Sequence, residues 1–168
     1  VDVMALVTAI NSWDYSVPLQ LMAEVIMTIL IILIARIYQK RKASTLGFVK
    51  KNAVSSYIIG MVAGFVIFSF AVLICMIFGA VEIKVNPESL NVGLFLCFFV
   101  GWLFQGMAEE VICRGFMLTT IARKNSLIAA ILGNSLFFAA IHLGNAGISV
   151  LALINLTLFG IFASLIFL

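Results

Sequence analysis

The chain has 168 residues, of which 64% are hydrophobic and only 10% are charged, and its mean hydropathy is +1.25. Soluble domains are about half apolar and about a quarter charged, and a soluble protein of this size cannot hide so much apolar surface. The composition therefore excludes an ordinary soluble domain. The net charge of +3 is too small to indicate a nucleic-acid-binding protein, so we expect membrane lipid as the main surroundings and no nucleic-acid partner.

Five apolar stretches are long enough to be spanning helices, which need about 20 mostly apolar residues. In chain order they are about Leu19–Tyr38, Val54–Phe78, Val92–Ala122, Leu127–Leu143 and Ile148–Leu168. The pattern predicts an all-α fold, a polytopic transmembrane bundle of about five helices. Residues 18–168 would form this transmembrane domain, and residues 1–17, with their aromatic residues, an interfacial lead-in.

The connections between these stretches differ in charge. Basic residues crowd the first connection, residues 39–53, and the third, residues 121–126, whereas the second is mixed and includes Glu82 and Glu88. With five spans the first and third connections lie on one side, and their charge predicts that this side is cytoplasmic. We therefore expect a multi-pass protein of a bacterial plasma membrane with its N-terminus outside.

Three charged residues, Glu109, Glu110 and Arg114, lie deep in the third stretch. A charge at the centre of a bilayer costs a few kcal/mol or more, so such residues need partners or a function. Glu110 and Arg114 are four residues apart and can pair on one helix face. Glu109 points elsewhere and keeps a free carboxylate, which suits a general base. The alternative is a buried ion network that only fixes helix packing.

The single histidine, His142, ends the fourth stretch and lies on one helix face with Phe138. At 1.5 Å per residue, Glu109 and His142 lie about 20 Å and about 26 Å from the short connection that joins their helices. The two side chains are therefore expected at similar depth, where they can share one water molecule. A lone histidine in an apolar helix is otherwise most often a structural residue.

Other hydrolytic chemistries do not fit this sequence. One histidine cannot make the HExxH motif of zinc proteases, GxSxG is absent, and Ser135 lies two helical turns from His142. Asp2 and Asp14 are both in the lead-in, which excludes an intramembrane aspartyl pair. Cys113 beside Arg114 remains an alternative nucleophile, although a small packing residue is the simpler interpretation. The hydrolytic chemistry that remains is attack by a water molecule that a glutamate and a histidine activate.

Two motifs then suggest a family. Glu109-Glu110-Val-Ile-Cys-Arg114 resembles the EExxxR motif, and Phe138-Ala-Ala-Ile-His142 resembles the FxxxH motif, of the CPBP proteins. These are the CAAX prenyl endopeptidases and the bacteriocin-processing or immunity proteins, once called the Abi family. The resemblance covers about residues 93–168, and Leu46-Gly47 is a weaker echo of it.

The resemblance implies an intramembrane endopeptidase acting on a peptide or protein in or near the bilayer. Glu109 and His142 would be catalytic and would activate water, with Glu110, Arg114 and Phe138 supporting the site. No cofactor is expected, because a glutamate and a histidine are fewer ligands than zinc usually takes from a protein. The alternative with the same fold is a non-catalytic membrane protein that confers bacteriocin immunity or acts as a scaffold.

The sequence departs from the family pattern in one respect. The family carries a further histidine, with an asparagine four residues on, which are thought to hold the oxyanion of the tetrahedral intermediate. This chain has no second histidine. We therefore expect it to be a C-terminally truncated fragment of the family core that is inactive by itself.

Cysteine labelling tests the predicted topology. Cysteines placed at Lys42 and Lys124 should be labelled by a membrane-impermeant reagent only after the cytoplasmic side is opened. A cysteine at Glu88 should be labelled in intact cells, because an odd number of spans separates it from each basic connection. Labelling of position 42 from outside intact cells would contradict this topology.

Overall fold

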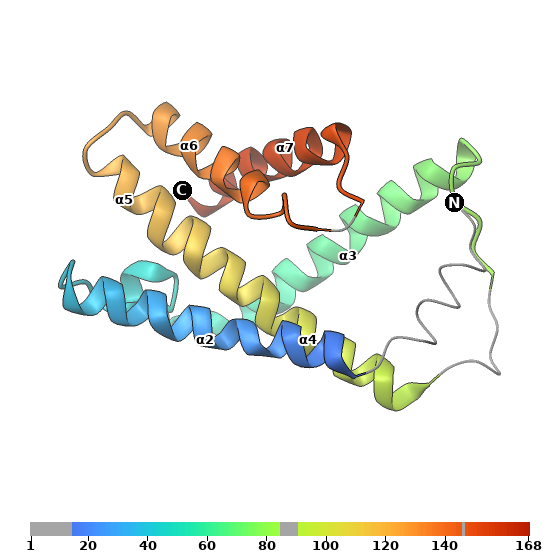
Figure 1. Ribbon diagram of the computed structural model, residues 1–168, viewed down its shortest axis with the longest axis horizontal. Helices are drawn as coiled ribbons and strands as arrows, with labels where there is room; N and C mark the ends of the chain where they lie inside the picture. The colour runs from blue at the N-terminus through green and yellow to red at the C-terminus, as the bar shows by residue number, and fades with distance from the viewer. Residues whose placement is uncertain (1–14, 85–90, 146) are drawn as a thin grey trace. The chain divides into compact units, whose positions relative to one another are not determined.

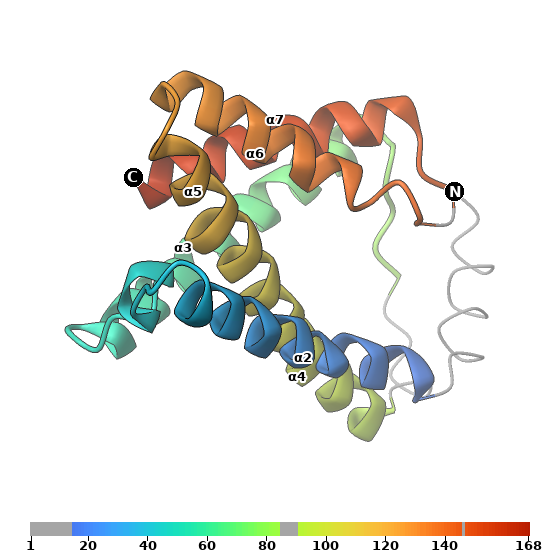
Figure 2. The same ribbon diagram turned by 60° about the vertical axis from the view of Figure 1, so that its left-hand side comes forward.

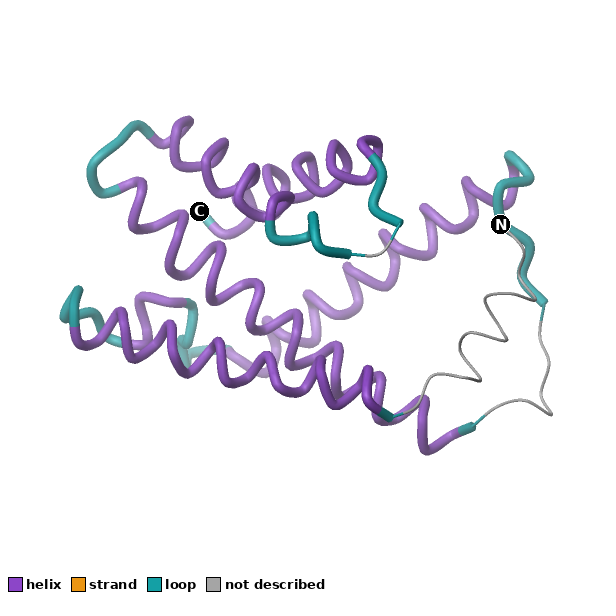
Figure 3. The backbone as a smooth tube through the Cα atoms, viewed as in Figure 1, coloured by secondary structure: helices purple, strands orange, loops and turns teal. Residues whose placement is uncertain are grey.

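The computed structural model describes residues 15–84, 91–145 and 147–168, and these form helices and no strands. The elements are α2 (Ser16–Ile37), the 3₁₀ turn η1 (Ala43–Leu46), α3 (Ala53–Ile77), α4 (Val92–Glu109), η3 (Glu110–Leu118), α5 (Thr119–Ala122), α6 (Leu127–Ala140) and α7 (Val150–Phe167) (Figures 1 and 3). The predicted all-α fold is confirmed. The lead-in predicted for residues 1–17 lies almost wholly outside the described residues.

The helices agree with the predicted spans in number and position. The segments α4, η3 and α5 follow one another without a break and make one long helix, Val92–Ala122, as predicted. Four helices are long and apolar enough to cross a membrane, and α6 is apolar but has only 14 residues. The chain therefore has the helices of a membrane protein, with one helix shorter than a bilayer requires.

The end of α6 corrects the sequence prediction. The fourth span was expected to reach Leu143 and to include His142, but α6 ends at Ala140. The next residues form tight turns, in which the His142 N–H donates to the Ala139 carbonyl at 3.1 Å and the Asn145 N–H to the His142 carbonyl at 3.0 Å. Glycine and asparagine follow in the sequence, and both favour turns over a continued helix. His142 therefore lies just beyond the helix.

The chain forms two compact units. One takes in Val49–Cys97, with α3 and the start of α4; the other takes in Pro18–Phe48 and Phe98–Leu168. Within the first unit, α3 is apolar along its whole length and buries none of its residues. A helix that is apolar on every side and not covered by protein needs lipid around it. The second unit contains all the residues of the candidate site.

Small residues let α6 and α7 pack closely in the second unit, where Figures 1 and 2 show them side by side. A Cβ atom on Gly160 would lie 2.9 Å from the Ser135 Cα, so the two backbones nearly touch. Beside this contact the Asn134 Nδ2 donates to the Ser164 Oγ at 2.9 Å, and both side chains are fully buried. Close backbone approach and a polar bond between helices are typical of membrane bundles.

The residues that directly follow α2 lie beside α5. The Gln39 Nε2 donates to the Thr120 Oγ1 at 3.3 Å, and the Arg41 Nη2 donates to the Thr119 Oγ1 at 2.8 Å. Burial, and then the nearby charge of Arg123, lower the pKa of Arg41. The basic connections that follow α2 and α5 therefore begin at the same end of this unit.

The contact at Gly160 predicts a specific loss of stability. Gly160→Ala should lower the free energy of unfolding by about 1–3 kcal/mol, because the new methyl group meets the backbone of α6, which cannot move aside cheaply. The matched control is Gly106→Ala, where a Cβ meets no atom within 4 Å and alanine favours the helix. Thermal unfolding in detergent should show a lower melting temperature for Gly160→Ala only; equal melting temperatures would contradict the packing argument.

Candidate active site

The EExxxR motif lies at a change of helix type. Glu109 is the last residue of α4, and Glu110–Leu118 form the π-helical segment η3. Sequence reasoning treated this stretch as an ordinary α-helix, because residue propensities carry no signal for a π-helix. Such segments are rare and occur frequently at functional sites. Glu109 therefore belongs to the α-helix, and Glu110 belongs to the π-helical segment.

Glu110 and Arg114 form the predicted pair. The Glu110 Oε1 lies 3.1 Å from the Arg114 Nη1, and the Arg114 side chain is completely buried while that of Glu110 is 52% exposed. The N–H groups of Arg114 are not aimed at an acceptor, so none of its three guanidinium nitrogens makes a hydrogen bond within the described residues. The buried charge is therefore balanced by one carboxylate at its edge.

Phe138 joins the two motifs. The Arg114 guanidinium carbon lies 4.7 Å from the centre of the Phe138 ring, a favourable position for a cation over an aromatic face. The imidazole of His142 lies on the same ring, with the two centroids 4.8 Å apart. Phe138 is 2% exposed, so its buried ring contacts both the guanidinium and the imidazole.

The FxxxH spacing also fixes the tautomer of His142. The His142 Nδ1 lies 2.7 Å from the Phe138 carbonyl oxygen, four residues back. A carbonyl can only accept, so Nδ1 carries the hydrogen and donates it. In the neutral imidazole, Nε2 is then left with a free lone pair. This nitrogen faces Glu109.

Glu109 and His142 come together, as the depth argument predicted. The His142 Nε2 lies 3.7 Å from the Glu109 Oε1, and the side chains are 16% and 25% exposed. This distance is too long for a direct hydrogen bond, and polar groups at such a separation are commonly joined by a water. The pair is half-buried, so water can reach it.

Sequence reasoning missed two polar neighbours of Glu109. The Gln105 Nε2 donates to the Glu109 Oε1 at 3.0 Å. The half-buried Glu24 of α2 lies close enough for its charge to repel that of Glu109. Both signals were visible in the sequence, since Gln105 lies one turn before Glu109 and Glu24 is an acidic residue within the first apolar stretch.

The alternative nucleophiles are engaged elsewhere. Cys113 is completely buried in the π-helical segment, and the Ser135 Oγ donates to the Ile131 carbonyl at 2.7 Å. Neither makes a contact with His142 among the described residues. Among the described residues, no group of three or more His, Cys, Asp or Glu side chains could hold a metal ion. Zinc usually takes at least three protein ligands, so this set does not fit it.

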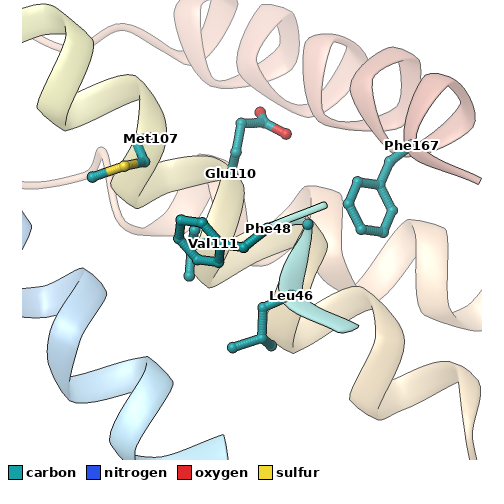
Figure 4. Close-up of a pocket in the computed structure, with 7 residues that line it drawn as sticks. Leu46, Phe48, Met107, Glu110, Val111 and Phe167 are labelled. Atoms are coloured by element: carbon teal, nitrogen blue, oxygen red, sulfur yellow. The ribbon is translucent and has the colours of Figure 1, made fainter. Parts of the chain in front are cut away.

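A cavity opens on the Glu110 side of the π-helical segment, apart from the Glu109–His142 pair. Its volume is about 290 Å³, and its lining is apolar except for the Glu110 carboxylate (Figure 4). The lining residues are Leu46, Gly47, Phe48, Met107, Glu110, Val111 and Phe167. The exposed half of Glu110 therefore faces a different space from Glu109.

Comparison with known proteins bears on this site. Residues 91–168 match the family described as type II CAAX prenyl endopeptidase Rce1-like. This segment is Rce1-like. The match confirms the family expected from the two motifs, and the Rce1-like segment contains Glu109, Glu110, Arg114, Phe138 and His142. No curated protein and no solved structure matched the chain significantly.

The two glutamates of the Rce1-like segment should differ in their effect on stability. Glu110→Gln removes the carboxylate that pairs with a completely buried guanidinium. Loss of one partner of a fully buried pair costs about 3–5 kcal/mol, and the loss here should be smaller because the Glu110 side chain is 52% exposed and solvent screens its charge. Glu109→Gln is the comparison, because its amide keeps the shape and the ion pair of Arg114 among the described residues is with Glu110, although Arg114 also attracts Glu109. Unfolding in detergent should show a larger loss for Glu110→Gln than for Glu109→Gln; equal losses would contradict this account.

Proposed function

We propose that the protein is an intramembrane endopeptidase that hydrolyses a peptide bond with a water held between Glu109 and His142. One observation carries the proposal. The Glu109 carboxylate and the Nε2 of a neutral His142 are both acceptors, and they face each other 3.7 Å apart. A water molecule has two hydrogens and can donate one to each.

The chemistry that follows is general-base hydrolysis. Glu109 takes a proton from the water while the water oxygen forms a bond to the carbonyl carbon of the substrate. The tetrahedral intermediate then loses its amine as the carbon–nitrogen bond breaks, and the proton held by Glu109 goes to the leaving nitrogen. Gln105 keeps the carboxylate in place through Oε1, and the Phe138 carbonyl holds a hydrogen on Nδ1, which makes Nε2 the acceptor of the neutral ring. No step needs a metal.

Glu110, Arg114 and Phe138 have supporting roles in this proposal. Arg114 is too deeply buried to touch a substrate, and Glu110 faces another space. Their pairing, together with the stacking on Phe138, fixes the π-helical segment against α6. The substrate is a peptide or protein that reaches the site in or beside the bilayer, and the family name makes C-terminal CAAX peptides the first candidates to test.

The proposed topology has residues 39–53 and 121–126 at the cytoplasmic face of a bacterial plasma membrane. The contacts between Gln39 and Thr120 and between Arg41 and Thr119 support it, because they bring the two basic connections to the same end of one unit. A positive end of this kind favours the cytoplasmic side.

Activity measurements on the protein as its gene encodes it test the proposed function. In proteoliposomes, Glu109→Gln and His142→Gln should each lower the cleavage rate of CAAX peptides, with and without a prenyl group, by at least about 10²-fold. Glu82→Gln is the control, because this exposed carboxylate pairs with the exposed Lys84 and lies outside the compact unit that contains the site. Full activity in folded Glu109→Gln would refute the proposed base. A folded wild-type protein that binds peptides without cleaving them would support the non-catalytic immunity or scaffold alternative.

A further inference from the structure

Arg41 ties the connection after α2 to the π-helical segment. Its Nη2 donates to the Gly115 carbonyl at 3.0 Å, to the Thr119 Oγ1 at 2.8 Å and to the Thr45 carbonyl at 2.8 Å. Its Nε donates to the Thr45 Oγ1 at 3.1 Å. The residue is only 6% exposed, so this basic side chain belongs to the interior and not to the solvated face of its connection.

The acceptor at Gly115 is a carbonyl whose α-helical donor, the Thr119 N–H, is directed elsewhere. In an α-helix the Thr119 N–H would donate to Gly115, four residues back. Here that N–H donates to the Phe116 carbonyl instead. The Gly115 oxygen accepts from the Thr119 hydroxyl at 2.6 Å and from Arg41 at 3.0 Å. The two side chains therefore add hydrogen bonds to this carbonyl where the π-helix ends.

Close packing holds the same connection in place. A Cβ atom on Gly115 would lie 2.5 Å from the Leu46 carbonyl oxygen, so only glycine allows this approach. Leu46 is 2% exposed, and Gly47 has a φ of +102°, which lets the chain turn away directly afterwards. The Leu46-Gly47 pair is thus the part of the connection that rests on the EExxxR helix.

We propose that Arg41 is a positioning residue for the active site, one that keeps η3 π-helical and so holds Glu109 opposite His142. The inference rests on the proposed function. Without Arg41 the Gly115 carbonyl loses a charged donor, and the α-helical bond from the Thr119 N–H becomes the better alternative. Converting the π-helix to an α-helix changes the register by one residue, which rotates the preceding residues by about 100°. Glu109 would then no longer face His142.

Arginine suits this role better than lysine. Its planar guanidinium offers five donors in a fixed arrangement, whereas a lysine offers one flexible ammonium. Here the donors reach acceptors on two segments, Thr45 in the connection and Gly115 and Thr119 in the helix. Arg41→Lys can keep the charge but only part of this geometry, so an intermediate effect is expected.

The ring signals of His142 make a direct test possible. In protein labelled with ¹⁵N-histidine, the signals of His142 are those that His142→Gln removes, and Glu109→Gln identifies the change expected when the carboxylate partner of His142 is lost. Arg41→Ala should shift the His142 signals as well, and Arg41→Lys should shift them less. Lys42→Ala is the matched control, since this exposed neighbour has the same charge, and it should keep the wild-type spectrum.

Kinetics provide the second readout. Arg41→Ala should lower kcat by about 10²-fold with little change in KM, as expected for a displaced catalytic group. If Arg41→Ala does not fold, Thr119→Val takes the place of that variant in both measurements, because it removes the hydroxyl that donates to the Gly115 carbonyl. A wild-type His142 spectrum in a folded Arg41→Ala or Thr119→Val protein overturns the inference. Failure of the proposed function is separate, because absent Glu109-dependent cleavage leaves the spectral test intact.

Discussion

The site is organised around one buried charge. The Arg114 guanidinium has no exposed surface and makes no hydrogen bond among the described residues, and it lies in a largely apolar bundle. Removing such a charge from water costs several kcal/mol. The Glu110 carboxylate offsets that cost at one edge and the face of Phe138 at another. The EExxxR helix and α6 are thereby held together at the point where Phe138 also presents its carbonyl to His142.

The same arrangement explains why the two adjacent glutamates differ. Glu110 begins the π-helical segment and forms an ion pair with Arg114. Glu109 ends α4 and faces Gln105 and His142. Consecutive residues on a helix point in different directions, so one carboxylate can serve structure while its neighbour stays available to water. The helix register determines which glutamate faces Arg114 and which faces His142. The hydrogen bonds at the Gly115 carbonyl hold that register near the C-terminal end of the π-helical segment.

Sequence reasoning recovered what depends on pattern and spacing. Apolar runs predicted the helices to within a few residues, and the spacing from the short connection after α5 brought Glu109 and His142 to the same level. It missed what depends on the backbone. The π-helical segment has no compositional signal, so the role of Gly115 as an acceptor for Arg41 could not be seen. The end of α6 was set three residues too late, because the turn residues from Ile141 to Leu143 were counted as helix. Glu24 was overlooked although its charge stands in an apolar stretch.

The short α6 has a consequence for how water reaches the site. Its 14 residues make a helix about 21 Å long, whereas the hydrocarbon core of a bilayer is about 30 Å thick. A helix that starts near one face therefore ends inside the core, and the turn with His142 follows at that depth. Backbone that is not helical is tolerated there only where protein covers it or water reaches it. Among the described residues protein does not cover this turn, since the residues from Ile141 to Asn145 are exposed apart from His142 itself. In the proposed topology we therefore expect water to reach the turn, beside the two acceptors that the proposed hydrolysis requires.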